Sequence, residues 1–425
     1  MDVLNRAGHT FARYFSRHIS RYYLLVLSLL LLASLTACDK YEVTVYKPEK
    51  VWDSYTLPTG ALGGFSPIID MEGNLVTRFR CNGFPAKLLP DGSVVCHSLK
   101  TGALEVPELR QVAADGTILW RFRNWSRNSA KQHHDFQFSG GNPVGYYVPG
   151  MDMIGPADGG NMLVLGHYLN KMSMQDIRLG RLLDDVVYEI DAAGNVLWEW
   201  HAKDHIDEMG FSEAALRDIR FEPLSSDWLH VNTVSYIGPN KWYEQGDSRF
   251  HPDNIIISSP RARWVAIIDR LSGHFVWRLG PDFSPGNPGS DFGGINFPHH
   301  AHIIPQGLPG AGNLLVFDNG TFSGFGDQYT AGRLYSRVLE INPIDASVVW
   351  EYRGNLFSLN MSSAQRLPNG NTFITEGLKG RMLEVTAEKE VVWEARGLPL
   401  YRAYRVPKEW VKPSEEYLQQ VQSVE

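Results

Sequence analysis

One repeated pattern constrains the fold more than any other feature of the chain: a turn with Asp or Gly, two β-forming residues and then Trp. It reads, for example, "DGTILWRF" and "NPIDASVVWEY". Five copies carry the Trp and a weaker sixth lacks it; they occupy residues 115–122, 191–200, 269–279, 342–352, 386–395 and, without Trp, 70–79. A second pattern, a Gly/Pro turn feeding an apolar strand as in "LPNGNTFITEG", alternates with the first. Both patterns indicate β-hairpin units.

Six short β units with a regular aromatic residue are typical of a propeller, in which four-stranded blades stack around a central channel. A blade cannot bury both faces of its sheet alone, so the repeated Trp is expected to pack between blades. We predict an all-β, six-bladed β-propeller over residues 61–400, preceded by a linker at 38–60 and followed by a tail at 401–425. One short helix is expected at 210–220. The 40 Gly and 24 Pro among 425 residues agree with a turn-rich fold.

The segment before the propeller, residues 1–37, is predicted to be a signal peptide. Its apolar run 23–37 follows several Arg residues. The run is shorter than the about 20 residues of a membrane span and suits the apolar region of a signal peptide. It ends in "LTAC", which resembles the lipobox of bacterial lipoproteins. Cys38 is therefore expected to be lipidated and to hold the protein on the periplasmic side of a membrane; the alternative is an uncleaved signal anchor.

The net charge argues about which partners the protein can bind, and the cysteine content about whether it can form a disulfide. The net charge is −7 and the body of the chain has no Lys/Arg-rich stripe, which argues against nucleic-acid binding. Two Cys remain after Cys38, namely Cys81 and Cys96. In an oxidising compartment they can pair, and closing a loop of that length contributes roughly 3 kcal/mol. The alternative is that both are small buried hydrophobic residues.

Histidines recur at a similar phase of three predicted blades. "KQHHDFQF" carries His133 and His134, "DWLHVNTV" carries His230, and "HHAHIIP" carries three more at 299–302. Each group lies upstream of a strand of the second pattern. Because inner strands and loops of a propeller converge at its axis, the sequence predicts one shared axial site. Imidazoles in such a site serve either as metal ligands or as a nucleophile with supporting groups.

The motifs "DWLHVNTV", "NIIISSPRARWVAIIDR", "HHAHIIP", "NLLVFDNG" and "LPNGNTFITEG", in this order, resemble those of the bacterial arylsulfate sulfotransferase (ASST) family. The resemblance covers roughly residues 110–395. It implies a six-bladed propeller and transfer of a sulfuryl group from an aryl sulfate donor to a phenolic acceptor. It also implies a sulfated histidine intermediate, no cofactor and no need for the nucleotide donor PAPS. The lipobox makes the chain similar to a lipoprotein-type member of this family.

The resemblance also assigns roles to individual histidines. His300 precedes a small residue and the "FDNG" strand, as the family nucleophile does. His230 matches the histidine of the family motif DW-x-H-x-N. His134 matches an earlier family histidine, with His133 as the alternate. The remaining two imidazoles of "HHAH" are expected to support the site.

Three further site residues follow from the same motifs, with one departure. The family arginine is expected directly after Ser259, but Pro260 stands there and Arg261 follows. We assign the role to Arg261, although a one-residue slip reverses a strand side chain unless a bulge absorbs it. Asn232 and Asn319 lie in the matching motifs and are assigned to substrate binding.

Two other classes of function remain open at this point. His134, His230 and two imidazoles of "HHAH" are candidate ligands for zinc or copper, although Asp135 is the one carboxylate at ligand spacing near them. A non-enzymatic binding propeller is the third reading, because a fold does not fix a function. A quinone-dependent dehydrogenase is disfavoured, since such propellers usually have eight blades.

Overall fold

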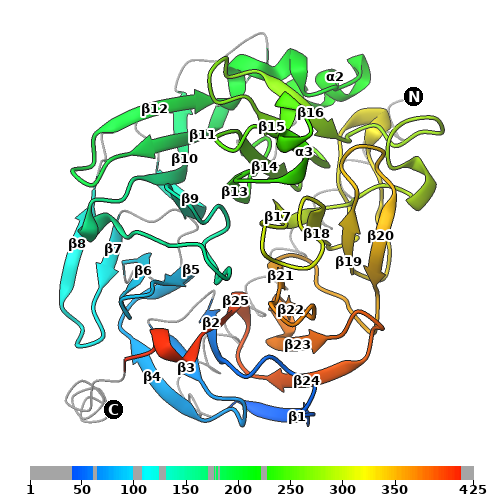
Figure 1. Cartoon of the computed structure of the whole chain (residues 1–425). Helices are drawn as coiled ribbons and strands as arrows, with labels where there is room; N and C mark the ends of the chain where they lie inside the picture. The colour runs from blue at the N-terminus through cyan, green and yellow to red at the C-terminus, as the bar shows by residue number, and fades with distance from the viewer. Residues whose placement is uncertain are drawn as a thin grey trace, which may run out of the picture. The chain divides into compact units, whose positions relative to one another are not determined.

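Antiparallel sheets arranged as blades of a ring make up the described part of the chain (Figure 1). The computed structural model describes residues 41–60, 65–98, 108–123, 131–170, 177, 179, 182–221 and 227–412. The predicted signal peptide and the lipidation site Cys38 lie outside these residues, as do residues 413–425 of the predicted tail, so lipidation stays a prediction. None of the described helices is long and apolar enough to cross a membrane.

Each blade is an antiparallel sheet with one edge strand nearest the axis in Figure 1. From the innermost strand outward, the first three blades are β25 (Leu400–Val406), β2 (Tyr55–Gly60), β3 (Ser66–Ile69), β4 (Leu75–Phe79); β5 (Asn82–Leu88), β6 (Val94–His97), β7 (Leu109–Val112), β8 (Ile118–Phe122); and β9 (Lys131–Phe138), β10 (Met162–Asn170), β11 (Leu182–Ile190), β12 (Val196–His201). The other three are β13 (Thr233–Tyr236), β14 (Ile255–Ser259), β15 (Trp264–Ile268), β16 (Phe275–Leu279); β17 (Pro298–Ile303), β18 (Leu314–Asp318), β19 (Arg337–Ile341), β20 (Val348–Tyr352); and β21 (Ser362–Arg366), β22 (Thr372–Glu376), β23 (Arg381–Val385), β24 (Val391–Arg396), β1 (Glu42–Tyr46). The prediction of an all-β, six-bladed propeller is confirmed.

Strands from both ends of the described chain close the ring. β25 is the innermost strand of the first blade, and β1 adds to the outer edge of the sixth, where Glu42 pairs with Arg396. The predicted propeller limits of 61–400 are therefore too narrow. Residues 42–46 and 55–60 of the predicted linker are strands, as are residues 401–406 of the predicted tail. These segments lack the repeated turn and Trp. They add strands to the first and sixth blades, whose repeat segments are residues 70–79 and 386–395.

Helical segments are short and lie in connections. They are α2 (Glu213–Phe221), α3 (Lys241–Glu244) and the 3₁₀ turns η1 (Pro156–Asp158), η2 (Ala202–Glu208), η3 (Ser248–Phe250), η4 (Ser290–Phe292), η5 (Gly326–Gln328), η6 (Gly377–Lys379) and η7 (Lys408–Trp410). α2 confirms the short helix predicted at 210–220. α3 begins at a capping residue, Asn240, whose side chain accepts hydrogen bonds from the main-chain N–H groups of Trp242 and Tyr243.

Trp residues of the repeat join five of the six blades to the next one. In five neighbouring pairs of blades, a Trp indole N–H donates to a main-chain carbonyl in the next blade. The pairs are Trp120–Ala192 (2.7 Å), Trp200–Gly273 (2.9 Å), Trp277–Pro343 (2.8 Å), Trp350–Ala387 (2.9 Å) and Trp393–Met71 (2.8 Å). The expected packing of Trp between blades is confirmed, and each indole both fills apolar space and satisfies a turn carbonyl.

Two positions depart from this rule. In the third blade Trp198 occupies the register of the other repeat Trp residues, opposite Glu189, but Trp200 donates the hydrogen bond. Trp198 instead lies 4.4 Å below the guanidinium of Arg270 in the next blade. In the first blade Thr77 stands at the Trp position, opposite Ile68.

The structure pairs Cys81 with Cys96 in a disulfide, with 6.0 Å between their Cα atoms. Both residues are fully buried. Cys81 lies just before β5 and Cys96 lies on β6, so the bond joins the entry of the second blade to its own second strand. This agrees with the paired alternative drawn from the sequence.

We expect Trp393→Phe to destabilise the protein more than Trp350→Phe. Met71 is buried, so the first change leaves a buried carbonyl without its donor, which costs about 1–3 kcal/mol. Ala387 is exposed, so water can replace the indole of Trp350. Urea unfolding of both variants measures the difference, and equal losses of unfolding free energy would contradict it.

Candidate functional site

The three histidines predicted to be catalytic share an unusual backbone conformation. His134, His230 and His300 have φ of 53°, 56° and 50°. This left-handed region is unfavourable for residues other than Gly and costs about 1–3 kcal/mol at each position. His134 and His300 each lie at a register shift. β9 shifts against β10 between Val164 and Gly166 of β10, and β17 shifts against β18 between His299 and His302 of β17. Such bulges re-aim side chains, and retained strain of this kind clusters at functional sites.

Contacts between blades that are not neighbours place these histidines at the axis. The ring of His134, in the third blade, lies 6.1 Å from that of Tyr401 in the first. The ring of His300, in the fifth blade, lies 5.9 Å from that of Tyr404, also in the first blade. Innermost strands meet in this way only around the centre of the ring (Figure 1). The structure therefore places His134 and His300 around the axis, while a single site shared by both stays a prediction.

His134 and His230 are in direct contact. Their ring centroids are 4.5 Å apart with the rings nearly perpendicular. His230 Nδ1 donates a hydrogen bond to the Asp227 carboxylate, three residues earlier in the same motif. Burial alone would lower the pKa of His230, but the Asp227 carboxylate more than offsets this and raises the pKa above its ordinary value. A raised pKa favours the protonated form of His230.

Arg261 contacts the main chain beside this pair. It lies in the turn between β14 and β15, where its guanidinium Nη1 donates to the main-chain carbonyl of Asp227 at 2.6 Å. Its guanidinium also lies 5.6 Å from the ring of Phe325. The hydrogen bond to Asp227 supports the segment that carries His230.

A buried charge cluster crosses the axis and involves residues that the sequence did not single out. Asp135 Oδ1 lies 3.0 Å from Lys87 Nζ, and Asp135 Oδ2 lies 2.8 Å from Arg402 Nη1. All three side chains are almost completely buried. Burial alone would raise the pKa of Asp135, but Arg402 and Lys87 lower it, so the carboxylate is charged. Burial lowers the pKa of Lys87 to about 8. Two cations then face one anion, which favours an anionic ligand on the axis.

His300 is held as a neutral imidazole. Its Nδ1 donates to the carbonyl oxygen of Ala364 at 2.9 Å, because a carbonyl can only accept. Burial lowers the pKa of His300 well below its ordinary value, and the charge of Arg402 lowers it further. Nε2 therefore carries a lone pair, and among the described residues it has no hydrogen-bond partner. His302 is engaged on both sides, since Nδ1 donates to the carbonyl of His300 and Nε2 accepts from the Tyr146 hydroxyl.

The two predicted substrate-binding asparagines hold other parts of the site in place. Asn319 Oδ1 accepts from His299 Nδ1 at 2.8 Å, and its amide nitrogen donates to the Ser358 carbonyl. Asn232 donates to the carbonyl of Pro298 at 2.8 Å, which joins the fourth blade to the fifth. Their amide groups are thus engaged within the protein, and direct substrate binding by either stays a prediction.

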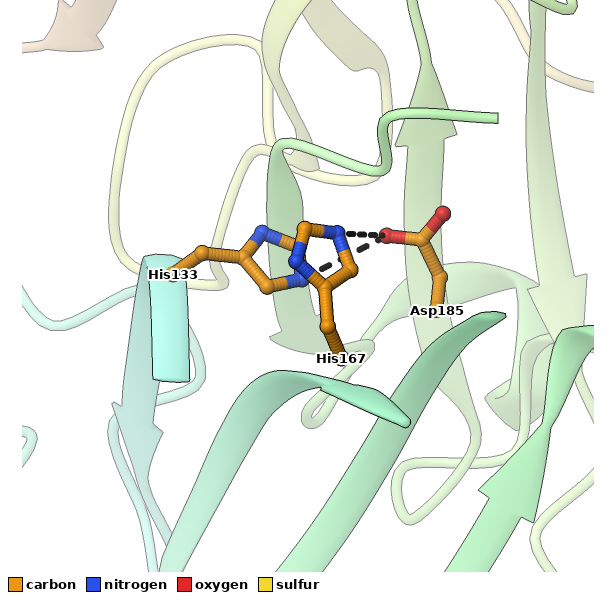
Figure 2. Close-up of side chains that lie close together, drawn as sticks. All are labelled: His133, His167 and Asp185. Carbon is orange, nitrogen blue, oxygen red and sulfur yellow. Dashed lines mark ion pairs between the residues drawn. The ribbon is translucent and has the colours of Figure 1, made fainter. Parts of the chain in front are cut away.

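Two groups of described side chains have metal-ligand spacing. They are His133 with His167 and Asp185 (Figure 2), and His205 with Glu208 and His274. The alternative metal site, built from His134, His230 and imidazoles of "HHAH", is not among the described groups with this spacing. Sequence reasoning also missed Lys87, Arg402 and Asp227. Of these only Asp227 carried a signal, since it begins the quoted motif "DWLHVNTV".

Fold and site together define a six-bladed propeller with a histidine- and arginine-bearing axial site. The family model for arylsulfotransferases (ASST) matches residues 152–398, more than half of the chain. The chain therefore belongs to the arylsulfotransferase family, and this membership points to aryl sulfotransferase activity. No curated protein matches the chain.

Similar solved structures share little sequence with this chain. A protein of unknown function from Bacteroides caccae is 12% identical with a TM-score of 0.46, over 83% of this chain and 99% of its own. Apo AztD from Citrobacter koseri is 10% identical with a TM-score of 0.39, over 83% and 98%. Quinohemoprotein alcohol dehydrogenase from Comamonas testosteroni is 12% identical with a TM-score of 0.37, over 83% and 59%. Similarities this low carry no functional argument.

We expect Asp135→Asn to lower the free energy of unfolding by about 3–5 kcal/mol, because it leaves two buried cations without their anion. Glu390→Gln is the matched control, since Glu390 also pairs with two cations, Lys47 and Lys50, but at the exposed surface. Surface pairs contribute little. Urea unfolding at neutral pH measures both changes, and a control loss as large as that of Asp135→Asn would refute the argument from burial.

Proposed function

We propose that the protein transfers a sulfuryl group from an aryl sulfate donor to a phenolic acceptor, independently of PAPS, through a sulfohistidine formed on His300. The observation that carries this proposal is the neutral, strained imidazole of His300 on an axis that also holds buried cations. Membership of the arylsulfotransferase family supports it.

In the first step, the lone pair on His300 Nε2 attacks sulfur. An N–S bond forms, the S–O bond to the aryl group breaks, and the electron pair of that bond goes to the departing aryl oxygen. His230, whose proton is stabilised by Asp227, is suited to protonate this oxygen. Lys87 and Arg402 supply positive charge for the sulfuryl oxygens, where negative charge is carried through the transition state.

In the second step, the acceptor phenol attacks sulfur and the N–S bond breaks. The electron pair of that bond returns to Nε2 of His300, and the phenolic proton passes to the now neutral His230. Both histidines regain their starting protonation states, so the cycle balances. Since Nδ1 keeps its proton on the Ala364 carbonyl throughout, the sulfated ring is a good leaving group. Division into two displacements predicts ping-pong kinetics.

We expect brief exposure to 4-nitrophenyl sulfate to add about 80 Da, the mass of one sulfuryl group, to the intact protein. Peptide mapping should place the adduct on His300, and His300→Ala should abolish both adduct and turnover. His299→Ala is the matched control, because its Nδ1 is likewise bonded to an oxygen, on Asn319, whereas its Nε2 lies 3.4 Å from the N–H of Met361.

The control should keep the adduct at position 300. An adduct mapped to His299 would refute the assignment of the nucleophile. Absence of any adduct and of turnover with aryl sulfates in the wild-type protein would refute the proposed function.

We expect Asp227→Asn to shift the alkaline limb of the pH profile of kcat/KM to lower pH. Asp227 raises the pKa of His230, so removing the carboxylate lowers that pKa, and His230 loses its proton at a lower pH. Asp158→Asn, a change at an exposed carboxylate, is the control and should leave the profile unchanged. An alkaline limb that stays in place in Asp227→Asn would exclude His230 as the acid.

A further inference from the structure

We propose that Phe297 and Phe322 bind the aryl group of the substrate, and that they favour aryl groups with two fused rings. Phe297 directly precedes β17, and Phe322 lies in the connection between β18 and β19. Their ring centroids are 6.2 Å apart. This inference rests on the proposed sulfuryl transfer and deepens it, because it names the part of the aryl sulfate that these side chains recognise.

Three aromatic rings form a row that leads outward from the neighbourhood of the axis. The ring of His299, on β17, lies 5.6 Å from that of Phe297, which in turn contacts Phe322. His299 is almost completely buried, Phe297 is half-buried and Phe322 is 59% exposed. Burial lowers the pKa of His299 to about 3, and the charges of Arg402 and His230 lower it further. The inner end of the row is therefore close to the groups proposed to react.

Strand pairing places this row at the end of the ring where the innermost strands begin. The first residue of β17, Pro298, pairs with the last residue of β18, Asp318, so Phe297 and the connection that carries Phe322 share one end. Four antiparallel strands return the chain to the end at which a blade began, so consecutive innermost strands begin at the same end. His230 lies shortly before β13, the innermost strand of the preceding blade, and is therefore at this end too.

The outer part of the row belongs to a larger apolar group. Thr321 Oγ1 donates to the main-chain carbonyl of Leu359 at 3.1 Å, which holds the connection carrying Phe322 against the segment before β21. Leu359 is 49% exposed. Met361, in the same segment, is half-buried, and its N–H lies 3.4 Å from His299 Nε2. Apolar side chains exposed singly are ordinary, whereas exposed apolar side chains that gather beside polar groups mark binding sites.

The backbone of Phe297 and Met361 is held in the left-handed region, with φ of 55° and 52°. This region is unfavourable for bulky side chains and persists where the surrounding structure enforces it. Ala346 and Lys389 also have positive φ, but they lie in the turns between β19 and β20 and between β23 and β24, where such values are ordinary. Phe297 and Met361 instead directly precede innermost strands. The strain found at the three histidines thus extends to the apolar group.

The two Phe rings suit the apolar part of an aryl sulfate, while Lys87 and Arg402 suit its anionic part. Aromatic rings contact one another in offset or edge-to-face arrangements, with centroids about 4.5–7 Å apart. A single substrate ring beside His299 reaches the inner ring of the pair, Phe297. A second, fused ring extends outward along the row and reaches Phe322 as well. The pair therefore favours a two-ring aryl group over a one-ring group.

The test compares a one-ring donor, 4-nitrophenyl sulfate, with a two-ring donor, 4-methylumbelliferyl sulfate, at a fixed concentration of phenol as acceptor. Phe322→Ala should lower kcat/KM about tenfold for the two-ring donor and at most about twofold for the one-ring donor. The loss should appear as a raised KM with unchanged kcat, since the contact is made equally in the ground and transition states. Phe322→Tyr keeps the ring and should retain the wild-type preference. Tyr329→Ala is the matched control, because it removes a ring of similar exposure, 55%, from the same connection.

Binding of 4-methylumbelliferone, the phenol of the two-ring donor, gives a second readout that needs no turnover. Fluorescence titration should show a Kd raised about tenfold in Phe322→Ala and unchanged in Tyr329→Ala. Equal Kd values in the wild-type protein and Phe322→Ala, or no binding by the wild-type protein, would overturn the inference. Equal losses of kcat/KM with both donors would overturn the preference for two rings. Absence of turnover with both sulfates would refute the sulfuryl transfer, whereas binding of the phenol that depends on Phe322 would still support the aryl site, so the two failures are distinguishable.

Discussion

The carboxylate of Asp135 is the interaction on which the centre of the ring depends. It holds Lys87 from the second blade and Arg402 from the first, so three innermost strands are joined where no water surrounds the charges. A buried ion pair adds little net stability, but an unpaired buried charge is costly. The cluster therefore matters less as a source of stability than as the reason two cations remain on the axis. Burial lowers the pKa of His300 and His302, and this positive charge lowers it further. The same charge suits the anionic sulfate ester of the proposed reaction.

The propeller fold could be predicted from the sequence because the Trp contact between neighbouring blades repeats along the chain. Trp follows the turn in five copies, and in each blade concerned an indole reaches the next blade. The ends of the ring were not readable, because β1 and β25 complete sheets begun by distant segments and carry no repeat of their own. A sequence pattern that recurs along the chain predicts how neighbouring segments pack. Closure of the ring instead pairs strands from the two ends of the described chain, β2 with β25 and β1 with β24.

The site was predictable only in part, for a related reason. Phase within the repeat brought His134, His230 and His300 to one axis. Arg402 lies in a segment interpreted as a tail, and Asp185 pairs with His167 through a register that no spacing reveals. The metal alternative illustrates the same limit. The sequence directed it to the axial histidines, whereas the described groups with metal-ligand spacing are His133 with His167 and Asp185, and His205 with Glu208 and His274.

Ring closure by β25 has a consequence for the order in which the site is completed. Synthesis from the N-terminus delivers every histidine of the axis before Arg402, and domains tend to fold as they emerge. Five blades and most of the first can pair while Asp135 still lacks the arginine. β25 is the last of the described strands to leave the ribosome, and it both closes the ring and brings Arg402 to the axis. A chain whose synthesis stops before β25 therefore carries the axial histidines without Arg402.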